Sequence, residues 1–268
     1  MDSEIEDVRL DQLNHDEWST VAGPEWNDVD ALHAHLSQNT NIMEASLRLP
    51  WDALVPESAV VLDLGCGSGW LTGMLTKNPR VDKVIAWDLS PALLGEVLPG
   101  MVRLMGGDVD KVERVCGRFT PIMLDDHSID LVVMSSAFHH EPDPDALLRE
   151  LVRVARPTGA IVLLNEVPYS VMWMLFASAT MAIASAVNAM TTRVTIKKRG
   201  HIAADHVLYD DDLGDRAFTQ SQWVRLFKRH DLDFMKVDTS LPSYPQSYRR
   251  RNPLESNLTH FILRPTVR

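Results

Sequence analysis

Alternating glycines between two aspartates are the residues whose types and spacing point most clearly to chemistry. Asp63 opens the pattern D-x-G-x-G-x-G within VVLDLGCGSGWLT (60–72), between an apolar run and a helical pattern. Glycines where a strand turns into a helix let backbone N–H groups approach a ligand with no side chain in the way. Asp88 lies 23 residues after Gly65, at the predicted end of the next strand, where a carboxylate can accept both hydroxyls of a ribose. The pattern therefore predicts a nucleoside-binding loop.

Two other kinds of glycine loop do not fit this stretch. A phosphate-binding P-loop needs a lysine and then Ser or Thr after its last glycine, whereas Gly69 is followed by Trp70 and Leu71. The dinucleotide fingerprint G-x-G-x-x-G would have Trp70 at its last position, where an indole would hold the helix away from the strand. These mismatches favour a nucleoside without a long phosphate bridge.

Strand and helix patterns alternate around this loop. Apolar strands are expected at residues 60–64, 83–87, 112–116, 131–135 and 160–164, and helices at 70–77, 91–98 and 144–155, the last stopped by RPTG. A later helix is expected to begin after Thr219, with Gln222 completing a capping box, and two strands at 234–237 and 260–263 follow it. The alternation predicts an α/β fold with a parallel sheet and helices on both faces.

Three stretches in this order resemble successive motifs of the class I S-adenosylmethionine-dependent methyltransferases. They are VVLDLGCGSGWLT, VIAWDLSPALL and IMLDDHSIDLVVMSSAFHHEPDPDALLRELVRVARPTGAIVLLNE, within residues 60–167. The nearest likeness is to the branch that includes quinone, sterol and natural-product enzymes. The resemblance implies a Rossmann-like fold with a seven-stranded, mostly parallel sheet whose last strand is antiparallel. It also implies S-adenosylmethionine as the cofactor.

The resemblance assigns roles to the residues of the glycine loop. Asp63 and the loop from Gly65 to Gly69 would line the methionine end of the cofactor, and Asp88 would bind its ribose. The candidate cofactor-binding residues are Asp63, Gly65, Cys66, Gly67, Gly69, Asp88, Leu89, Phe119 and Ser135.

The chain departs from the family after the third strand. The family usually has a Gly-Asp pair there, with the carboxylate near the adenine amino group, but this chain has Gly117-Arg118. Arg118 cannot accept a hydrogen bond. Either Phe119 stacks on the purine, or another carboxylate such as Asp108 substitutes, or the loop differs without consequence.

Three side chains are candidates for catalysis. Methyl transfer from a sulfonium is an in-line displacement, in which the protein positions the acceptor and a base helps only if the acceptor atom carries a proton. His139 and His140 follow the fourth strand and Glu166 follows the fifth, at the edge of the sheet where such folds bind ligands. An imidazole titrates near neutral pH, which suits it to proton transfer. The alternatives are that a histidine here only braces the loop, or that the acceptor is merely positioned.

An uncharged stretch between Val167 and Thr192 contains the apolar run 171–190. Its length permits a membrane span, but Ala, Ser, Thr and Asn fill half of it. We expect a buried lid or a helix at a homodimer contact, with membrane-surface contact as a less favoured alternative. Nearby His201, Asp205 and His206 lack a fourth ligand, so no metal site is predicted.

Composition sets the remaining expectations. The 268 residues carry a formal net charge of −11, which disfavours nucleic-acid binding, and the two cysteines and the acidic N-terminus indicate a cytoplasmic protein. The expected organisation is an N-terminal helical cover (1–50), a cofactor-binding core (51–167), a helical lid (168–217) and a C-terminal completion of the core (218–268). The predicted function is methylation of a small or lipid-like molecule, foremost at oxygen. Methylation at carbon or nitrogen, and a non-catalytic cofactor-binding partner subunit, are the alternatives.

Overall fold

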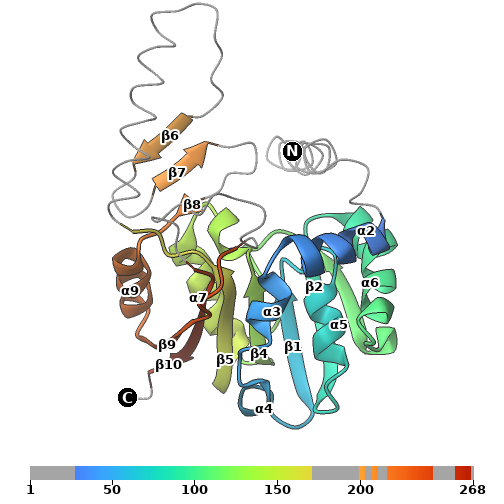
Figure 1. Cartoon of the computed structure of the whole chain (residues 1–268). Coiled ribbons are helices and arrows are strands. Elements are labelled where there is room, and N and C mark those ends of the chain that lie inside the picture. Colours follow the sequence, from blue (N-terminus) through green and yellow to red (C-terminus); the bar gives the residue numbers. More distant parts are fainter. Residues whose placement is uncertain (1–27, 171–198, 203–206, 211–215, 244–256, 267–268) are drawn as a thin grey trace, which may run out of the picture.

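A seven-stranded sheet forms the centre of the computed structural model, which describes residues 28–170, 199–202, 207–210, 216–243 and 257–266 (Figure 1). Its strands are β1 (Ala59–Leu64), β2 (Val81–Asp88), β3 (Val112–Cys116), β4 (Ile129–Ser135), β5 (Ala155–Glu166), β9 (Leu232–Asp238) and β10 (Thr259–Pro265). The strand order is β3-β2-β1-β4-β5-β10-β9, and β10 runs antiparallel to both of its neighbours. The predicted mostly parallel sheet with an antiparallel last strand is confirmed.

Helices cover both faces of this sheet, and the central strands carry apolar residues on both faces. On β1, Val61 packs in one apolar cluster, whereas Leu62 and Leu64 pack in the other. One face carries α2 (Val29–Ala34), α4 (Trp51–Leu54), α5 (Trp70–Thr76) and α6 (Leu98–Leu104), and the other carries α7 (Pro144–Val154) and α9 (Gln220–Arg229). Strands buried on both faces read as continuous apolar runs, as the sequence of β1 and β4 does.

The helix predicted at 91–98 is longer than its sequence pattern suggested. A π-helical turn, η3 (Leu93–Val97), leads directly into α6, which continues to Leu104. Pro99 lies in the first turn of α6, where its missing N–H leaves no helical hydrogen bond unmade. Proline was therefore no barrier to extension at this position.

The RPTG tetrapeptide (156–159), predicted to stop the helix, follows the end of α7 and lies within β5. The helix ends at Val154 and the strand begins at Ala155, with a register irregularity where β5 starts to pair with β4. Regular pairing with β4 continues at Ala160, opposite Leu131, so residues 156–159 form an irregular start of the strand that a local pattern does not show.

The start of α9 matches its predicted capping box. Thr219 Oγ1 accepts from the Gln222 N–H at 3.2 Å, and Gln222 Oε1 accepts from the Thr219 N–H at 2.7 Å. Phe218 and Trp223 also meet across this turn, with ring centroids 4.7 Å apart, as a hydrophobic staple requires.

Residues before and after the core were predicted to cover the site. Before the core, the described residues form α2, a π-helical turn η2 (His35–Asn39) and α3 (Ile42–Ser46). Within 168–217, the described residues form an antiparallel sheet of β6 (Arg199–Ile202), β7 (Val207–Asp210) and β8 (Arg216–Ala217) rather than helices (Figure 1). The apolar run 171–190 lies outside the described residues. Among the helices that the structure describes, none has the length and apolar character needed to cross a membrane.

Candidate functional site

The carboxyl ends of the parallel strands bring the predicted site residues to one edge of the sheet, here called the carboxyl edge. Asp63 is the penultimate residue of β1, Asp88 ends β2, Ser135 ends β4 and Glu166 ends β5. The strand order reverses between β1 and β4, and open α/β sheets bind ligands in the crevice at such a switch point.

The glycine loop needs glycine at Gly65 and Gly69 for close packing. Both have positive φ, +75° and +84°, which side chains rarely adopt. A Cβ on Gly65 would lie 2.8 Å from Ala137 Cβ, and one on Gly69 would lie 2.6 Å from Leu98 Cγ. Gly67 differs, since a Cβ there would meet no described atom within 4 Å. The loop therefore packs tightly at its two ends and presents bare backbone to open space in the middle, which fits a ligand cradle.

Asp88 is held against this loop by backbone donors. Its Oδ2 accepts from the Gly67 N–H at 2.8 Å and its Oδ1 from the Ser90 N–H at 2.9 Å. Burial raises the pKa of this carboxyl, and these hydrogen bonds oppose the rise. Each carboxylate oxygen has two lone pairs, so both can still accept a hydroxyl hydrogen. This arrangement fits the predicted binding of a ribose.

Asp63 lies deeper, under the loop. Its side chain is 1% exposed and accepts a hydrogen bond from the Thr72 hydroxyl at 2.6 Å. Burial raises its pKa from 3.8 to about 7, and the nearby Asp88 carboxylate adds to the rise. A cationic ligand group near Asp63 would favour its charged form, as the amino group of a bound methionine moiety would.

Phe119 packs against the glycine loop from the segment that follows β3. Its ring atoms Cε1 and Cζ lie 3.1 and 3.2 Å from the position that a Cβ on Gly65 would take. Trp87 Nε1 donates to the Arg118 carbonyl at 2.9 Å and so fixes the backbone beside Phe119. These contacts bring the aromatic ring next to the loop that would cradle the cofactor.

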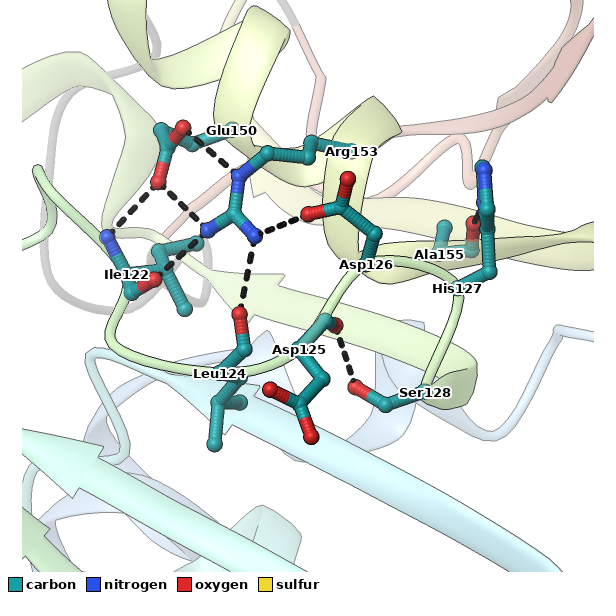
Figure 2. A network of polar contacts seen from close by, with 9 residues as sticks. All are labelled: Ile122, Leu124, Asp125, Asp126, His127, Ser128, Glu150, Arg153 and Ala155. Atoms are coloured by element: carbon teal, nitrogen blue, oxygen red, sulfur yellow. Dashed lines mark hydrogen bonds and ion pairs between the residues drawn. The ribbon is translucent and has the colours of Figure 1, made fainter.

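Arg153 anchors the segment after Phe119 to the end of α7, as Figure 2 shows. Its Nη1 donates to the Leu124 carbonyl and to Asp126, and its Nη2 donates to the Ile122 carbonyl and to Glu150. Its Nε donates to the other oxygen of Glu150 at 3.0 Å, so all five guanidinium N–H groups have partners. Sequence reasoning missed Arg153, whose only signal was a charged residue on the last turn of an amphipathic helix.

Asp108 cannot replace the carboxylate that the family usually places near the adenine amino group. It caps the short helix η4 (Val109–Lys111), which precedes β3, and its N–H donates to Thr76 at the end of α5. It therefore lies where β3 begins, at the edge opposite the cofactor residues. That alternative was wrong because the third strand separates Asp108 from the carboxyl edge.

His139 and Glu166 form a hydrogen-bonded pair at the carboxyl edge. His139 Nδ1 lies 2.9 Å from Glu166 Oε2, and Glu166 is 2% exposed whereas the His139 side chain is 22% exposed. His139 and His140 belong to η5 (Phe138–His140), and their rings are in tilted contact, with centroids 4.4 Å apart and planes at 46°. His140 also lies near enough to Asp88 to help lower the pKa of that carboxyl. The two histidines thus connect Glu166 with the predicted ribose site.

A buried polar network lies beside this pair and was not predicted from the sequence. Asn165 Nδ2 donates to Ser46 Oγ at 3.0 Å and to Ser135 Oγ at 2.9 Å. The Asn165 N–H donates to His260 Nδ1 at 3.1 Å, and His260 Nε2 lies 2.9 Å from the Ala45 carbonyl. Burial lowers the pKa of His260, which keeps the ring neutral. The network joins α3, β5 and β10 at the carboxyl edge, and only polar residues within apolar runs hinted at it.

Comparisons with known proteins agree with this geometry. Residues 62–163 match a family model described as a methyltransferase domain. The chain is 35% identical over 102 residues to a malonyl-acyl-carrier-protein O-methyltransferase of Halorhodospira halophila, covering 38% of this chain and 33% of that protein. It is 37% identical over 114 residues to an uncharacterized methyltransferase of Mycobacterium tuberculosis, covering 41% of each. Residues 62–163 therefore form a methyltransferase domain, and these matches support the class I S-adenosylmethionine-dependent methyltransferase family.

The similarity of this chain to its curated relatives is partial. The matched stretch spans only about a third and two-fifths of the two relatives named above. Among solved structures, a SAM-dependent methyltransferase from Aquifex aeolicus has a TM-score of 0.51 at 15% identity, covering 86% of this chain and 92% of that one. SpnF, a cyclase, has a TM-score of 0.55 at 13% identity, covering 85% and 80%. Likeness at this level shows the fold, and a cyclase among the neighbours shows that the fold does not determine the reaction.

Proposed function

We propose that this chain transfers a methyl group from S-adenosylmethionine to a hydroxyl oxygen of a small or apolar molecule, with His139 as the general base. The observation that carries the proposal is the 2.9 Å pair between His139 Nδ1 and Glu166 Oε2. It lies at the same edge of the sheet as the glycine loop and Asp88. A base there would serve an acceptor atom that carries a proton, and this favours oxygen over carbon.

The residues present fit the cofactor. The two oxygens of Asp88 would accept the ribose hydroxyls, the open backbone at Gly67 would lie along the methionine moiety, and Asp63 would face its amino group. Phe119 would supply a stacking surface for the purine, in place of the carboxylate that Arg118 cannot provide. When bound, S-adenosylmethionine supplies a methyl group on a positively charged sulfur, which departs as a neutral thioether.

Glu166 would set the tautomer and the orientation of the His139 ring. A hydrogen bond from Nδ1–H to Oε2 holds the tautomer that has its lone pair on Nε2, and the carboxylate stabilises the imidazolium that forms when Nε2 takes a proton. When the acceptor oxygen takes the methyl group, its hydroxyl proton would move to His139 Nε2. His140, whose ring contacts that of His139 and which lies near Asp88, would position this base relative to the cofactor.

Two observations support the proposed class of methyl acceptor. One relative acts at oxygen, as its name states, on a malonyl group carried by a protein. The second is the apolar run 171–190. If this run covers the site as predicted, its Met and Trp side chains would suit an apolar acceptor. We therefore propose a small or lipid-like acceptor, and the predicted homodimer contact through 171–190 remains part of this proposal.

Substitution of His139 tests the proposal against a matched pair elsewhere in the chain. His139→Ala should lower kcat by roughly 10²- to 10⁴-fold, because a positioned base contributes about that factor. The affinity for S-adenosylmethionine, measured by calorimetry, should remain within about twofold. His230→Ala is the control, since His230 Nε2 makes a similar 2.8 Å contact with Asp145 between α9 and α7. Full turnover of the His139, His140 and Glu166 alanine variants with unchanged pH dependence would leave positioning alone as the mechanism.

The alternative function is that of a non-catalytic partner subunit that binds the cofactor. One observation favours it: Arg118 stands where the family usually has the carboxylate that lies near the adenine amino group. Calorimetry with S-adenosylmethionine and S-adenosylhomocysteine, followed by a methyl-release assay on cell extract, separates the two functions. Binding with turnover supports the enzyme. Binding with no turnover under any extract fraction favours a partner subunit.

A further inference from the structure

Strand β8 and the residue after it hold the turn that carries the proposed base. Arg216 Nη1 donates to the His140 carbonyl at 2.9 Å. The ring of Phe218 lies against the ring of Phe138, the first residue of η5, with centroids 6.4 Å apart. A hydrogen bond therefore holds one end of η5 and an aromatic contact holds the other, and His139 lies between them.

The same stretch of chain also holds the segment that follows Glu166. The Tyr169 N–H donates to the Phe218 carbonyl at 2.8 Å, and Tyr169 forms a parallel β-bridge with Thr219. Glu166 ends β5 and lies three residues before Tyr169. Both members of the pair between His139 and Glu166 are thus attached to one stretch of chain that is distant from them in the sequence.

Arg216 also faces a buried carboxylate next to the turn. Glu141 follows η5 and is 7% exposed, and its Oε1 accepts from the Asp143 N–H at 2.9 Å. Burial raises the pKa of Glu141, and the charge of the Arg216 guanidinium is among the groups that oppose the rise. The guanidinium therefore has partners on two consecutive residues, the His140 carbonyl and the Glu141 carboxylate, at the end of η5.

The backbone that carries Arg216 belongs to the three-stranded sheet and not to the main one. Leu208 of β7 pairs with Arg216, and Figure 1 shows β8 between β7 and the carboxyl edge, where it contacts η5. A single 3-10 turn such as η5 closes few hydrogen bonds, and their geometry is poorer than in an α-helix. The turn that presents His139 therefore depends on contacts from other elements.

We propose that Arg216 is a positioning residue for methyl transfer, which holds η5 so that His139 stays aligned with Glu166. The proposal rests on the proposed function, because Arg216 acts through His139 and takes no part in the proton transfer. A misplacement of about 1 Å can lower a rate by about 10²-fold, so support of this turn has a measurable effect. The alignment of the base then depends on the place of β8.

Arg216→Met tests this role, because it keeps an unbranched stem and removes the donors and the charge. Arg80→Met is the matched control. Arg80 also joins a backbone carbonyl and a carboxylate: its Nη1 donates to the Asp52 carbonyl at 2.8 Å, and its Nε lies 3.0 Å from Glu57. It immediately precedes β2 and so lies at the edge of the sheet opposite the site.

The first measurement needs no methyl acceptor. NMR shifts of the ring nitrogens report which nitrogen of a histidine carries the proton, and the His139 signals are identified by their absence in His139→Ala. In the native chain and in Arg80→Met, neutral His139 should carry its proton on Nδ1, because Glu166 accepts that hydrogen. Arg216→Met should show a mixture of the two neutral tautomers. An unchanged His139 spectrum in Arg216→Met overturns the inference.

The second measurement uses the acceptor identified by untargeted mass spectrometry of extracts given enzyme and S-adenosylmethionine. Arg216→Met should lower kcat roughly 10- to 100-fold, and Arg80→Met should leave it unchanged. In the His139→Ala chain the same Arg216→Met substitution should change kcat by less than about twofold, because residues that act through one group are not additive. A merely structural role would lower kcat by the same factor in both chains.

Arg216→Lys is the rescue variant, since it keeps a donor and the positive charge but not the planar fork. Its kcat should exceed that of Arg216→Met by about threefold or more. Should Arg216→Met fail to fold, Arg216→Lys is compared with Arg80→Lys in both measurements, and an effect confined to Arg216→Lys supports the proposal. Equal behaviour of the two lysine variants overturns it.

The outcomes separate this inference from the proposed function. Equal losses of kcat in the native and His139→Ala chains, or no loss in Arg216→Met, overturn the inference while O-methylation stands. Full turnover of His139→Ala overturns the assignment of the base and the inference with it. Cofactor binding without any methylated product overturns the proposed function, and the ring-nitrogen spectra then still decide whether Arg216 holds the pair.

Discussion

At the scale of single residues, the site depends on carboxyl groups that folding removes from water. The motif around Asp63 identifies the residue, but its pKa depends on the fold. Burial and the Asp88 charge raise this pKa to about 7, and the hydrogen bond from the Thr72 hydroxyl opposes the rise. A folded-state pKa above the ordinary value of 3.8 means that the folded chain binds the proton more tightly than the unfolded chain. Its contribution to stability is therefore complete below pH 3.8 and is lost as the pH rises through about 7.

Asp63→Asn should remove much of this pH dependence in the cofactor-free chain. The native chain is expected to lose stability between about pH 4 and pH 7, at about 1.4 kcal/mol for each unit of pKa difference, while the variant stays flatter and is the more stable at pH 8. Some slope remains, because the pKa of Asp88 is raised too. Denaturant unfolding across this range measures it. Thr72→Val removes a donor to the carboxylate and so raises the pKa of Asp63, and the loss of stability should then extend to higher pH. An unchanged dependence of stability on pH in both variants would contradict the prediction.

The same substitution should weaken cofactor binding. Without the carboxylate, the amino group of the cofactor has no negative partner beneath the loop, and we expect the Kd of S-adenosylmethionine at pH 8 to rise roughly tenfold or more. A variant that is both more stable and weaker in binding would show that burial of Asp63 serves the ligand and not the fold. Unchanged affinity would remove Asp63 from the proposed site.

At the scale of elements, the segment between β3 and β4 owes its position to α7. Arg153 holds three backbone carbonyls or carboxylates on that segment, and Phe119 at its start lies against Gly65. Arginine suits this task because its planar fork presents five donors, whereas lysine has three. The distance in sequence between Arg153 and Phe119 is the reason that no local pattern reveals the connection.

Arg153→Lys is predicted to act on the cofactor through this segment. The Kd of S-adenosylmethionine should rise about three- to tenfold, or roughly 1 kcal/mol, because Phe119 is held less firmly. Arg156→Lys is the comparison variant, since Arg156 pairs with Asp130 at the start of β4 at 2.6 Å and contacts the segment only at its far end from Phe119, at the His127 carbonyl. A fall in melting temperature in both variants with no change in either Kd would mean that Arg153 is structural only.

At the scale of the whole molecule, ligand binding at the carboxyl edge should stabilise the entire sheet. Residues from β1, β2, β4 and β5 line the site, and the network around Asn165 connects the same edge to α3 and β10. A ligand at 100 times its Kd adds about 2.7 kcal/mol to the free energy of unfolding.

The melting temperature should therefore rise with S-adenosylmethionine or S-adenosylhomocysteine and not with NAD. S-adenosylmethionine or S-adenosylhomocysteine at that concentration should raise Tm by several degrees. NAD at the same concentration should leave Tm unchanged, because Trp70 occupies the position of the third dinucleotide glycine. The reverse result would reject the nucleoside interpretation of the glycine loop.

The sequence by itself determined the alternation of strands and helices from β1 to β5, the glycine loop with its two aspartates, and the capped start of α9. These features depend on contacts between residues a few positions apart, so residue types and their spacing in the sequence are enough to predict them. It also named His139 and Glu166 separately, from their places after two strands.

Only the tertiary structure decided that His139 and Glu166 pair, that Asp108 lies at the wrong edge, that residues 156–159 join β5, and that Arg153 and Asn165 support the site. Each of these depends on strand pairing or on burial between segments far apart in the sequence. Such contacts exist only once the sheet is assembled, and burial, which raises the pKa of Asp63, is a property of that assembly.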